Sequence, residues 1–320
     1  MKGLTDIDGI RVGHASDDHA MTGCTVILCE EGAVAGADIR GSASGTEEFT
    51  VLEPGHLVER IHAVVLAGGS AFGLEAASGV RRYLARKGVG FGIAGTIVPI
   101  VPAAILYDLA IGRSDVWPTR EMGEAAAAAA TSEAVEEGSV GAGTGATVGK
   151  AFGIDRAMKG GIGSATVSLG GASGVRVAAL AAVNALGDVI APNPGRILAG
   201  ARTAADSMEF ADTARALLDG LANIASPQNT TLVVVATNAH LSKVQARKLA
   251  QMAQIGMART IRPVHTMSDG DVVIALSLGS LEANINALGV AAAAAVEESI
   301  LRGVQYAKGM AGVPGLAGNR

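Results

Sequence analysis

Short apolar segments rich in branched side chains alternate along the chain with longer segments in which apolar residues recur every three or four positions. The first pattern is typical of buried strands, and the second is typical of helices that pack one face against a core. Strands are predicted at residues 24–29, 63–66, 178–183, 232–236 and 272–278. Helices are predicted at residues 74–86, 125–137, 201–224, 241–260 and 288–308. This interleaving indicates an α/β protein, with no repeat of fixed period.

The sharpest internal boundary follows the predicted helix 201–224. Residues 225–229 read Ala-Ser-Pro-Gln-Asn, a turn-rich segment that ends a helix before the apolar strand beginning at Thr231. The candidate chemistry lies at this boundary.

Composition narrows the class of protein. Hydrophobic residues make up 49% of the 320 positions and charged residues only 17%, which excludes a disordered polyelectrolyte. The length suffices for one large domain or two modest ones. The chain has 44 glycines but only five phenylalanines, three tyrosines and one tryptophan. We therefore expect a core of small aliphatic side chains with close backbone approaches.

Charge and cysteine usage bear on partners and location. The net charge of −5 and the lack of any Lys/Arg run argue against nucleic-acid or anionic-membrane partners. The start of the chain has no apolar signal segment, and the most apolar stretch, residues 97–106, is short and contains two prolines. A soluble cytoplasmic protein is therefore expected. Cys24 and Cys29 point to opposite faces of a predicted strand, so free core thiols are favoured over a disulfide.

Several motifs fail on inspection. Residues 90–95 fit G-x-G-x-x-G but follow a helix and lead into a proline-containing segment. Residues 145–150 resemble a phosphate loop with too few residues between the glycines. The histidines and cysteines lack zinc-site spacing, so neither a metal nor a cofactor is expected. Residues 68–73 are typical of a tight strand-to-helix turn, with a pocket wall including Ser70 as the alternative.

Thr230 is the candidate nucleophile. It stands between the turn-rich segment and a buried strand, so a cut before it would place its hydroxyl beside its own free α-amino group. That amine titrates near ~8 and can accept the hydroxyl proton. From spacing alone, a simple turn before a strand is the plainer interpretation.

Asp269 and Asp271 stand two apart, immediately before the predicted strand 272–278. On an extended backbone both carboxylates project to one face, where a neighbouring strand would bring them to the hydroxyl and amine of Thr230. Carboxylates this close share a proton or bind a cation. A solvated hairpin turn is the alternative. His265, just ahead of this turn, is predicted to make structural hydrogen bonds.

Seven ordered segments carry a resemblance to the DmpA-like aminopeptidases, which include L-aminopeptidase/D-amidase, β-peptidyl aminopeptidases, the pantetheine hydrolase ThnT and the 6-aminohexanoate-oligomer hydrolase NylC. The resemblance runs from about residue 6 to residue 279. The segments are residues 23–26 (GCTV), 62–74 (HAVVLAGGSAFGL), 98–104 (VPIVPAA), 141–150 (GAGTGATVGK), 158–164 (MKGGIGS), 183–185 (VNA) and 229–231 (NTT).

The resemblance implies a four-layer αββα sandwich, similar to the N-terminal-nucleophile (Ntn) hydrolases, with the connectivity of the DmpA and ornithine acetyltransferase type. It also implies that residues 1–320 form one domain, which cleaves itself at Asn229–Thr230 into an α chain of residues 1–229 and a β chain of residues 230–320. Such proteins usually assemble as homotetramers of these α/β pairs.

Residue by residue, the resemblance assigns Thr230 as the nucleophile of both self-cleavage and turnover. It assigns Asn184 as the amide that donates to the oxyanion. Asp269 and Asp271 match the Asp-x-Asp pair of the NylC-like branch, and Lys159 matches the active-site lysine of that branch.

The substrate pocket is less defined. Gly149 occupies the position where L-aminopeptidase/D-amidase has a tyrosine, which weakens transfer of that enzyme's substrate preference. Ser268, beside the acidic pair, is a further pocket candidate. Threonine at position 230 together with Asp-x-Asp favours the NylC and ThnT side of the family, and a small amide, peptide or oligoamide is the expected substrate.

Two other functions fit the same sequence. Self-cleaving threonine enzymes of similar architecture transfer acetyl groups between amino acids, so an acyltransferase is one alternative. A non-catalytic binding protein of the same fold is the other.

Overall fold

The computed structural model describes residues 2–170, 174–193, 195–221 and 229–318. Its helices are α1 (Glu75–Arg86), α2 (Arg120–Ala128), α3 (Thr213–Leu218), α4 (Lys243–Thr260) and α5 (Ile285–Gln305). Its strands are β1 (Arg11–Asp17), β2 (Thr22–Ile39), β3 (Gly45–Glu47), β4 (Arg60–Ala67), β5 (Phe91–Ile93), β6 (Thr96–Val98), β7 (Ala103–Ile105), β8 (Thr147–Val148), β9 (Met158–Lys159), β10 (Ile162–Ser168), β11 (Arg176–Asn184), β12 (Asp188–Ile190), β13 (Ile197–Ala199), β14 (Thr230–Ala239), β15 (Ile261–Arg262) and β16 (Val272–Leu281).

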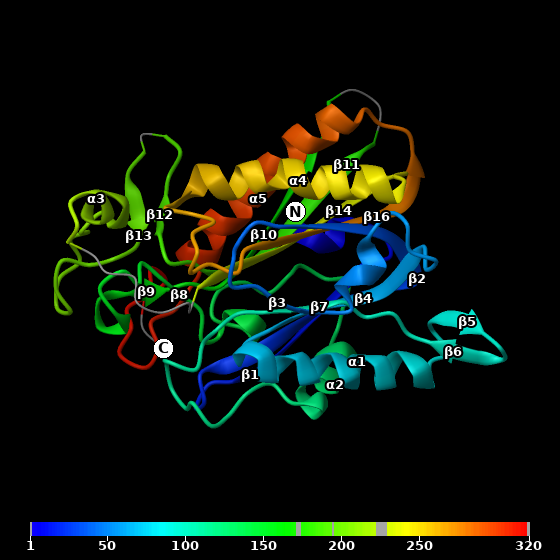
Figure 1. Cartoon of the computed structure of the whole chain (residues 1–320), viewed down its shortest axis with the longest axis horizontal. Helices are drawn as coiled ribbons and strands as arrows, with labels where there is room; N and C mark the ends of the chain where they lie inside the picture. Colours follow the sequence, from blue (N-terminus) through cyan, green and yellow to red (C-terminus); the bar gives the residue numbers. More distant parts are fainter. Residues whose placement is uncertain (1, 171–173, 194, 222–228, 319–320) are drawn as a thin grey trace.

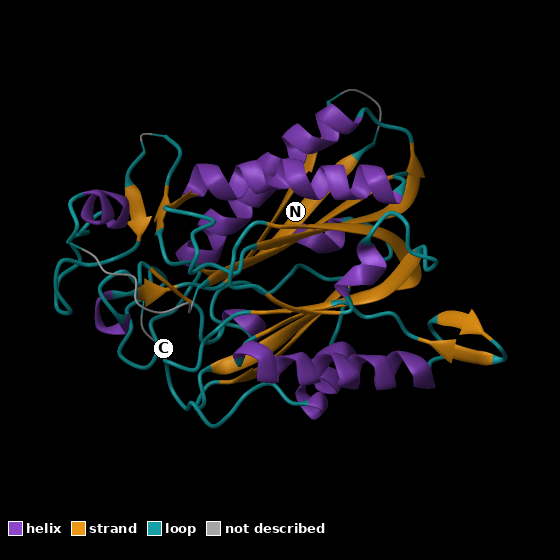
Figure 2. Ribbon diagram, viewed as in Figure 1, coloured by secondary structure: helices purple, strands orange, loops and turns teal. Residues whose placement is uncertain are grey.

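The long strand β2 belongs to both layers of a folded-over sheet. Its second half pairs with β16, so the first layer has the strand order β10-β11-β14-β16-β2. Its first half pairs with β1 and β4, and the second layer continues from β4 to β7 and β3. Helices α4 and α5 cover the outer face of the first layer, and α1 and α2 cover the outer face of the second (Figure 1; Figure 2). The arrangement is the predicted αββα sandwich.

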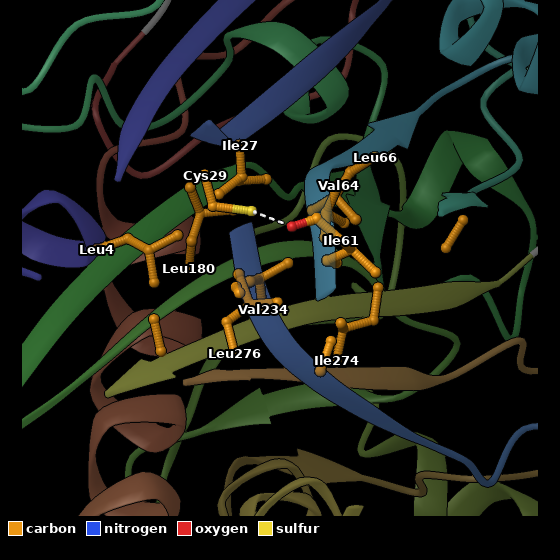
Figure 3. Packing of buried hydrophobic residues seen from close by; sticks show 14 of the residues in the cluster. Leu4, Ile27, Cys29, Ile61, Val64, Leu66, Leu180, Val234, Ile274 and Leu276 are labelled. Carbon is orange, nitrogen blue, oxygen red and sulfur yellow. Dashed lines mark hydrogen bonds between the residues drawn. The ribbon is translucent and has the colours of Figure 1, made fainter. Parts of the chain in front are cut away.

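Alternating side chains of the same strands fill separate cores. Ile27, Val64, Leu180 and Val234 meet between the two sheet layers (Figure 3). Other residues of these strands pack against α4 and α5 on one side and against α1 and α2 on the other. The alternation of period two along each strand directs successive side chains into different cores. These strands are therefore apolar on both faces, as expected for buried sheets.

The two cysteines follow this alternation as predicted. Cys29 lies in the central core, whereas Cys24 lies in the core beside α1 and α2. Both thiols are free and buried.

Small residues bring the layers together. A Cβ atom on Gly36 of β2 would lie 2.3 Å from the backbone nitrogen of Arg247 in α4. Only glycine permits this approach of strand and helix, which accounts for part of the high glycine content.

Two predicted helices differ from the structure. Helix α2 begins earlier and ends at Ala128, because the chain then turns so that Thr131 pairs with Val12 of β1. Of the predicted helix 201–224, only Thr213–Leu218 is helical within the described residues, because Arg202 instead pairs with Phe210. The predicted linker residues 225–228 lie outside the described residues.

None of the helices in the described residues is both long and apolar enough to cross a membrane.

Lys159 is a buried amine that binds backbone carbonyls of a glycine-rich segment. Its Nζ donates to the carbonyl oxygens of Thr144 and Ala146, each at 2.7 Å, and its side chain is fully buried. Burial lowers the pKa of Lys159 to about 7, although the charge of Asp108 acts in the opposite direction. A neutral amine retains two N–H donors, which match the two short contacts.

This burial predicts a pH dependence of stability. An unfolded lysine keeps its proton up to about pH 10.4, so above about pH 7 the unfolded chain holds more protons than the folded chain. The contribution of Lys159 to the free energy of unfolding therefore rises with pH in this range. We expect Lys159→Met to reduce the slope between about pH 8 and 9.5 by about 1 kcal/mol per pH unit. Urea unfolding at several pH values measures it.

The matched control is Lys248→Met, because Lys248 is exposed on α4. This control should keep the wild-type slope. Equal slopes for wild type and Lys159→Met would show that Lys159 stays charged in the folded protein.

Candidate active site

Thr230 opens the central strand β14 and lies between two neighbouring strands. On one side, antiparallel β11 places Asn184 directly opposite Thr230. On the other side, parallel β16 begins with Leu232 paired to Val272, and an isolated bridge joins Asn229 to Asp269. The prediction that the strand after Asp269 and Asp271 neighbours the strand of Thr230 is thus confirmed.

The peptide bond before Thr230 is buried and tightly enclosed. Asn229 and Thr230 are each 3% exposed. The Thr230 hydroxyl donates to the carbonyl oxygen of Asn229 at 2.5 Å, and the backbone N–H of Gly270 donates to the same oxygen at 2.8 Å. The side-chain amide of Asn229 donates to the carbonyl of Ser268 at 3.2 Å. The hydroxyl of Thr230 therefore lies against the carbonyl group that a cut would release.

The two acidic side chains are held by donors of the surrounding loops. Asp269 accepts from the backbone N–H and the hydroxyl of Thr266 and from the N–H of Leu186. Asp271 accepts from the N–H of Thr231 at 2.7 Å and from His265. Burial and then the charge of Asp271 raise the pKa of Asp269. Among the described residues, these hydrogen bonds replace the direct contact with the Thr230 hydroxyl expected from the sequence.

His265 makes the hydrogen bonds that the sequence predicts for it. Both its backbone N–H and its Nδ1 atom lie within hydrogen-bond distance of one Asp271 oxygen, at 3.1 and 2.9 Å. The backbone at His265 is left-handed, with φ of +57°. This conformation is rare for residues other than glycine, so other contacts must stabilise it. The two hydrogen bonds with Asp271 are such contacts.

Asn184 is fully buried, and its amide has a defined orientation. Its Oδ1 accepts from the backbone N–H of Thr147 at 3.0 Å and from the ammonium of Lys150 at 2.8 Å, while its Nδ2 donates to the carbonyl of Tyr107 at 3.0 Å. These three contacts fix the orientation of the amide on the residue that is paired with Thr230.

Lys150 is an ionisable group at this site for which no role was predicted from the sequence, although it ends the glycine-rich segment 141–150. Its Nζ donates to both oxygens of Asn184, the backbone one at 2.9 Å. Burial lowers the pKa of Lys150 to about 7, whereas the charges of Asp269 and Asp108 act to raise it. The sequence feature that could have indicated this role is a lysine directly after a glycine-rich apolar segment, because a lysine in such a place has little solvent-exposed surface nearby for its side chain.

Of the four remaining predicted residues, three make their contacts in other loops and one contacts Asn229. Lys159 holds carbonyls of the glycine-rich segment as described above. A Cβ atom on Gly149 would lie 2.0 Å from the backbone nitrogen of Ala201, so this glycine packs against another loop. Ser70 donates its N–H to the carbonyl of Leu106 in the turn that precedes α1. Ser268 contacts Asn229 directly.

Asp108 links the Ser70 turn to the site and was also missed from sequence. Its carboxylate accepts from the N–H of Gly69 at 2.7 Å and from the hydroxyl of Thr22 at 2.8 Å. Burial raises the pKa of Asp108 to about 6. The residue before it, Tyr107, supplies the carbonyl that accepts from Asn184. Asp108 is a single aspartate in an apolar stretch and forms no spaced motif with other polar residues, so its contact with the Ser70 turn could not be predicted from the sequence.

The arrangement can perform acyl transfer at a hydroxyl. A threonine hydroxyl contacts one carbonyl here, and an amide, two carboxylates and a lysine of lowered pKa lie in the adjoining segments. Perturbed pKa values of this kind cluster at functional sites. Within the described residues, no group of three or more His, Cys, Asp or Glu side chains is arranged to hold a metal ion.

Known proteins share both the sequence and the architecture. A family model described as Peptidase family S58 matches residues 2–317. An uncharacterized aminopeptidase of Mycobacterium leprae (strain TN) is 39% identical, covering 99% of this chain and 94% of the relative. The 6-aminohexanoate-oligomer endohydrolase of Kocuria sp. (strain KY2) is 32% identical, covering 92% of this chain and 84% of the relative.

Solved structures agree in fold. The L-aminopeptidase D-Ala-esterase/amidase of Ochrobactrum anthropi, described as a new variant among the Ntn hydrolase fold, has a TM-score of 0.72 at 21% identity, covering 97% of this chain and 87% of that one. A Burkholderia sp. β-aminopeptidase has a TM-score of 0.69 at 24% identity, covering 98% and 90%. The chain therefore has the Ntn-hydrolase fold and belongs to peptidase family S58, a family of amide- and peptide-bond hydrolases.

Proposed function

We propose that the chain is a self-cleaving N-terminal threonine amide hydrolase. The observation that carries this proposal is the contact of the Thr230 hydroxyl with the carbonyl group of Asn229, at the start of a buried strand. A hydroxyl in contact with this carbonyl group is a candidate to attack the preceding carbonyl carbon once it loses its proton.

In self-cleavage, the Thr230 Oγ adds to the carbonyl carbon of Asn229 and the carbonyl electron pair moves to oxygen. Collapse breaks the C–N bond, and the proton from the hydroxyl ends on the released nitrogen, which leaves an ester. Water then hydrolyses this ester to the Asn229 carboxylate and a free Thr230 hydroxyl. Maturation thereby creates the α-amino base.

In turnover, the same hydroxyl attacks a substrate amide while the α-amino group of Thr230 accepts its proton. This proton passes to the leaving amine as the substrate C–N bond breaks, and the acyl group stays on Thr230 as an ester. Asn184 donates to the developing oxyanion, a contribution worth ~3 kcal/mol per donor. Asp269 and Asp271 hold the loop around the new amino terminus, and Lys150 and Lys159 fix the segment that carries Asn184's partners. Water releases the acyl group.

The substrate class we propose is a small amide or oligoamide with a free amino end. The 32% identity to a 6-aminohexanoate-oligomer endohydrolase supports an oligoamide, and the 39% identity to an uncharacterized aminopeptidase supports a free amino end. The buried acidic pair supports attraction of a cationic amine. Ser70, Gly149 and Ser268 are proposed to border the pocket.

The assembly proposed with this function is one αββα domain made of two chains, residues 1–229 and 230–320. By resemblance to the family we also propose a homotetramer of these pairs in the cytoplasm, without metal or cofactor.

Intact mass tests the self-cleavage. Purified wild-type protein should convert from 31.9 kDa into two chains, the smaller beginning at Thr230. Thr230→Ala should remain at 31.9 kDa because it lacks the attacking hydroxyl. Mass spectrometry over several days of incubation distinguishes these outcomes.

Thr231→Ala is the matched control. Thr231 is the next residue in β14 and equally buried, and its hydroxyl has no hydrogen-bond partner among the described residues. This variant should cleave at a rate close to that of wild type. Wild-type protein that stays intact, or Thr230→Ala that cleaves, would refute the mechanism.

A substrate panel tests the reaction type. The mature enzyme should hydrolyse 6-aminohexanoate oligomers or β-peptides faster than pantetheine-like amides, α-peptides or amino-acid amides, measured as free amine released. An added amino-acid acceptor should leave the yield of free acid unchanged. Loss of free acid in favour of an acylated acceptor would instead identify an acyltransferase.

A further inference from the structure

We propose that the backbone N–H of Gly270 is the oxyanion-hole donor for self-cleavage at Asn229–Thr230. This inference rests on the proposed self-cleavage and adds a catalytic group to it. Neither the acidic pair nor Asn184 accounts for the contacts that carry the inference.

The geometry places this N–H on the atom that becomes charged. It donates at 2.8 Å to the carbonyl oxygen of Asn229, and the Thr230 hydroxyl lies against the same carbonyl group. When Oγ adds to the carbon, the C=O electron pair becomes an alkoxide on this oxygen. A donor already aligned with it strengthens its hydrogen bond as the charge develops, without any rearrangement.

The peptide group that carries this N–H is fixed at both ends. Its carbonyl, which belongs to Asp269, accepts from the N–H of Ala43 at 2.8 Å, while its N–H donates to Asn229. Two residues further on, the carbonyl of Asp271 accepts from the N–H of Arg40 at 3.1 Å. Hydrogen bonds in series polarise one another, so the Ala43 contact makes the Gly270 N–H a stronger donor.

The acidic pair on either side adds to this rigidity. Asp269 binds Thr266 and Leu186, and Asp271 binds Thr231 and His265. The two side chains thus hold the turn at four places in three different segments. In the uncleaved chain, their function is to aim the peptide between them.

Position 270 must be glycine because there is no room for a Cβ atom. A Cβ atom there would lie 2.6 Å from the Thr230 Oγ and 2.8 Å from the carbonyl oxygen of Ala43. Gly270 is not among the glycines with positive φ, so its backbone conformation suits other residues. The position therefore needs glycine because the turn packs directly onto the nucleophile.

Replacing one backbone atom tests the inference. Glycolic acid in place of Gly270, introduced by nonsense suppression in cell-free synthesis, substitutes an ester oxygen for the N–H and changes no side chain. We expect self-cleavage to slow by about 100- to 1,000-fold, as for loss of one oxyanion donor. The appearance of the chain beginning at Thr230 measures the rate.

Glycolic acid in place of Gly41 is the matched control. The N–H of Gly41 donates to the carbonyl of Asp271 at 3.3 Å, so its loss weakens the same turn without touching the reacting carbonyl. This control should cleave at nearly the wild-type rate. Equal rates for both ester variants would overturn the inference, whereas failure of wild type to cleave would refute self-cleavage itself.

Hydrogen exchange provides a readout that needs no change at Gly270. In the intact Thr230→Ala precursor the Gly270 amide should exchange slowly, because Asn229 holds it. In the cleaved wild type it should exchange faster, because the Asn229 acceptor is released. Rapid exchange in the precursor would contradict the inference even if the ester variant fails to fold.

Discussion

The site depends on the pairing of β14 with two strands of opposite direction. Antiparallel β11 brings Asn184 to one side of Thr230, and parallel β16 brings the turn of Asp269, Gly270 and Asp271 to the other. Because strand register is fixed by two buried faces, a shift of one residue would move every apolar side chain into the wrong core. The same packing that stabilises the sandwich therefore fixes which residues of β11 and of the turn before β16 lie beside Asn229 and Thr230.

A second constraint is the enclosure of charge in a core of small apolar residues. Burial raises the pKa of Asp108 and Asp269 and lowers the pKa of Lys150 and Lys159. Each of these groups is hydrogen-bonded and has at least one backbone partner, so its charge or polarity is compensated. Desolvated groups aligned in this way make strong electrostatic contributions to a reaction.

The sequence predicted the strands and long helices well because their apolar periodicity is strong. Strand β14 and helices α4 and α5 agree with prediction, since buried strands and long amphipathic helices leave clear patterns. The helix predicted at 201–224 was largely wrong within the described residues because a polar periodic segment can form loops when Arg202 finds backbone carbonyls to bind.

The site residues also fall into two groups, those that could be predicted from the sequence and those that could not. Thr230, Asn229, Asp269 and Asp271 could be selected from their place at a strand boundary and from the resemblance to known amidases. Lys150, Asp108 and Gly270 could not, because their positions depend on contacts between segments far apart in sequence. The backbone N–H of Gly270 in particular has no sequence signal beyond a glycine between two aspartates.

The central claim is that one residue, Thr230, both cleaves the chain and carries the acyl group in turnover. Acid quenching of the mature enzyme during reaction with an activated ester of 6-aminohexanoic acid, followed by tandem mass spectrometry, tests it directly. The account predicts one added acyl group on the amino-terminal residue of the smaller chain. An acyl group on any other residue, or turnover by enzyme that never carries one, would contradict it.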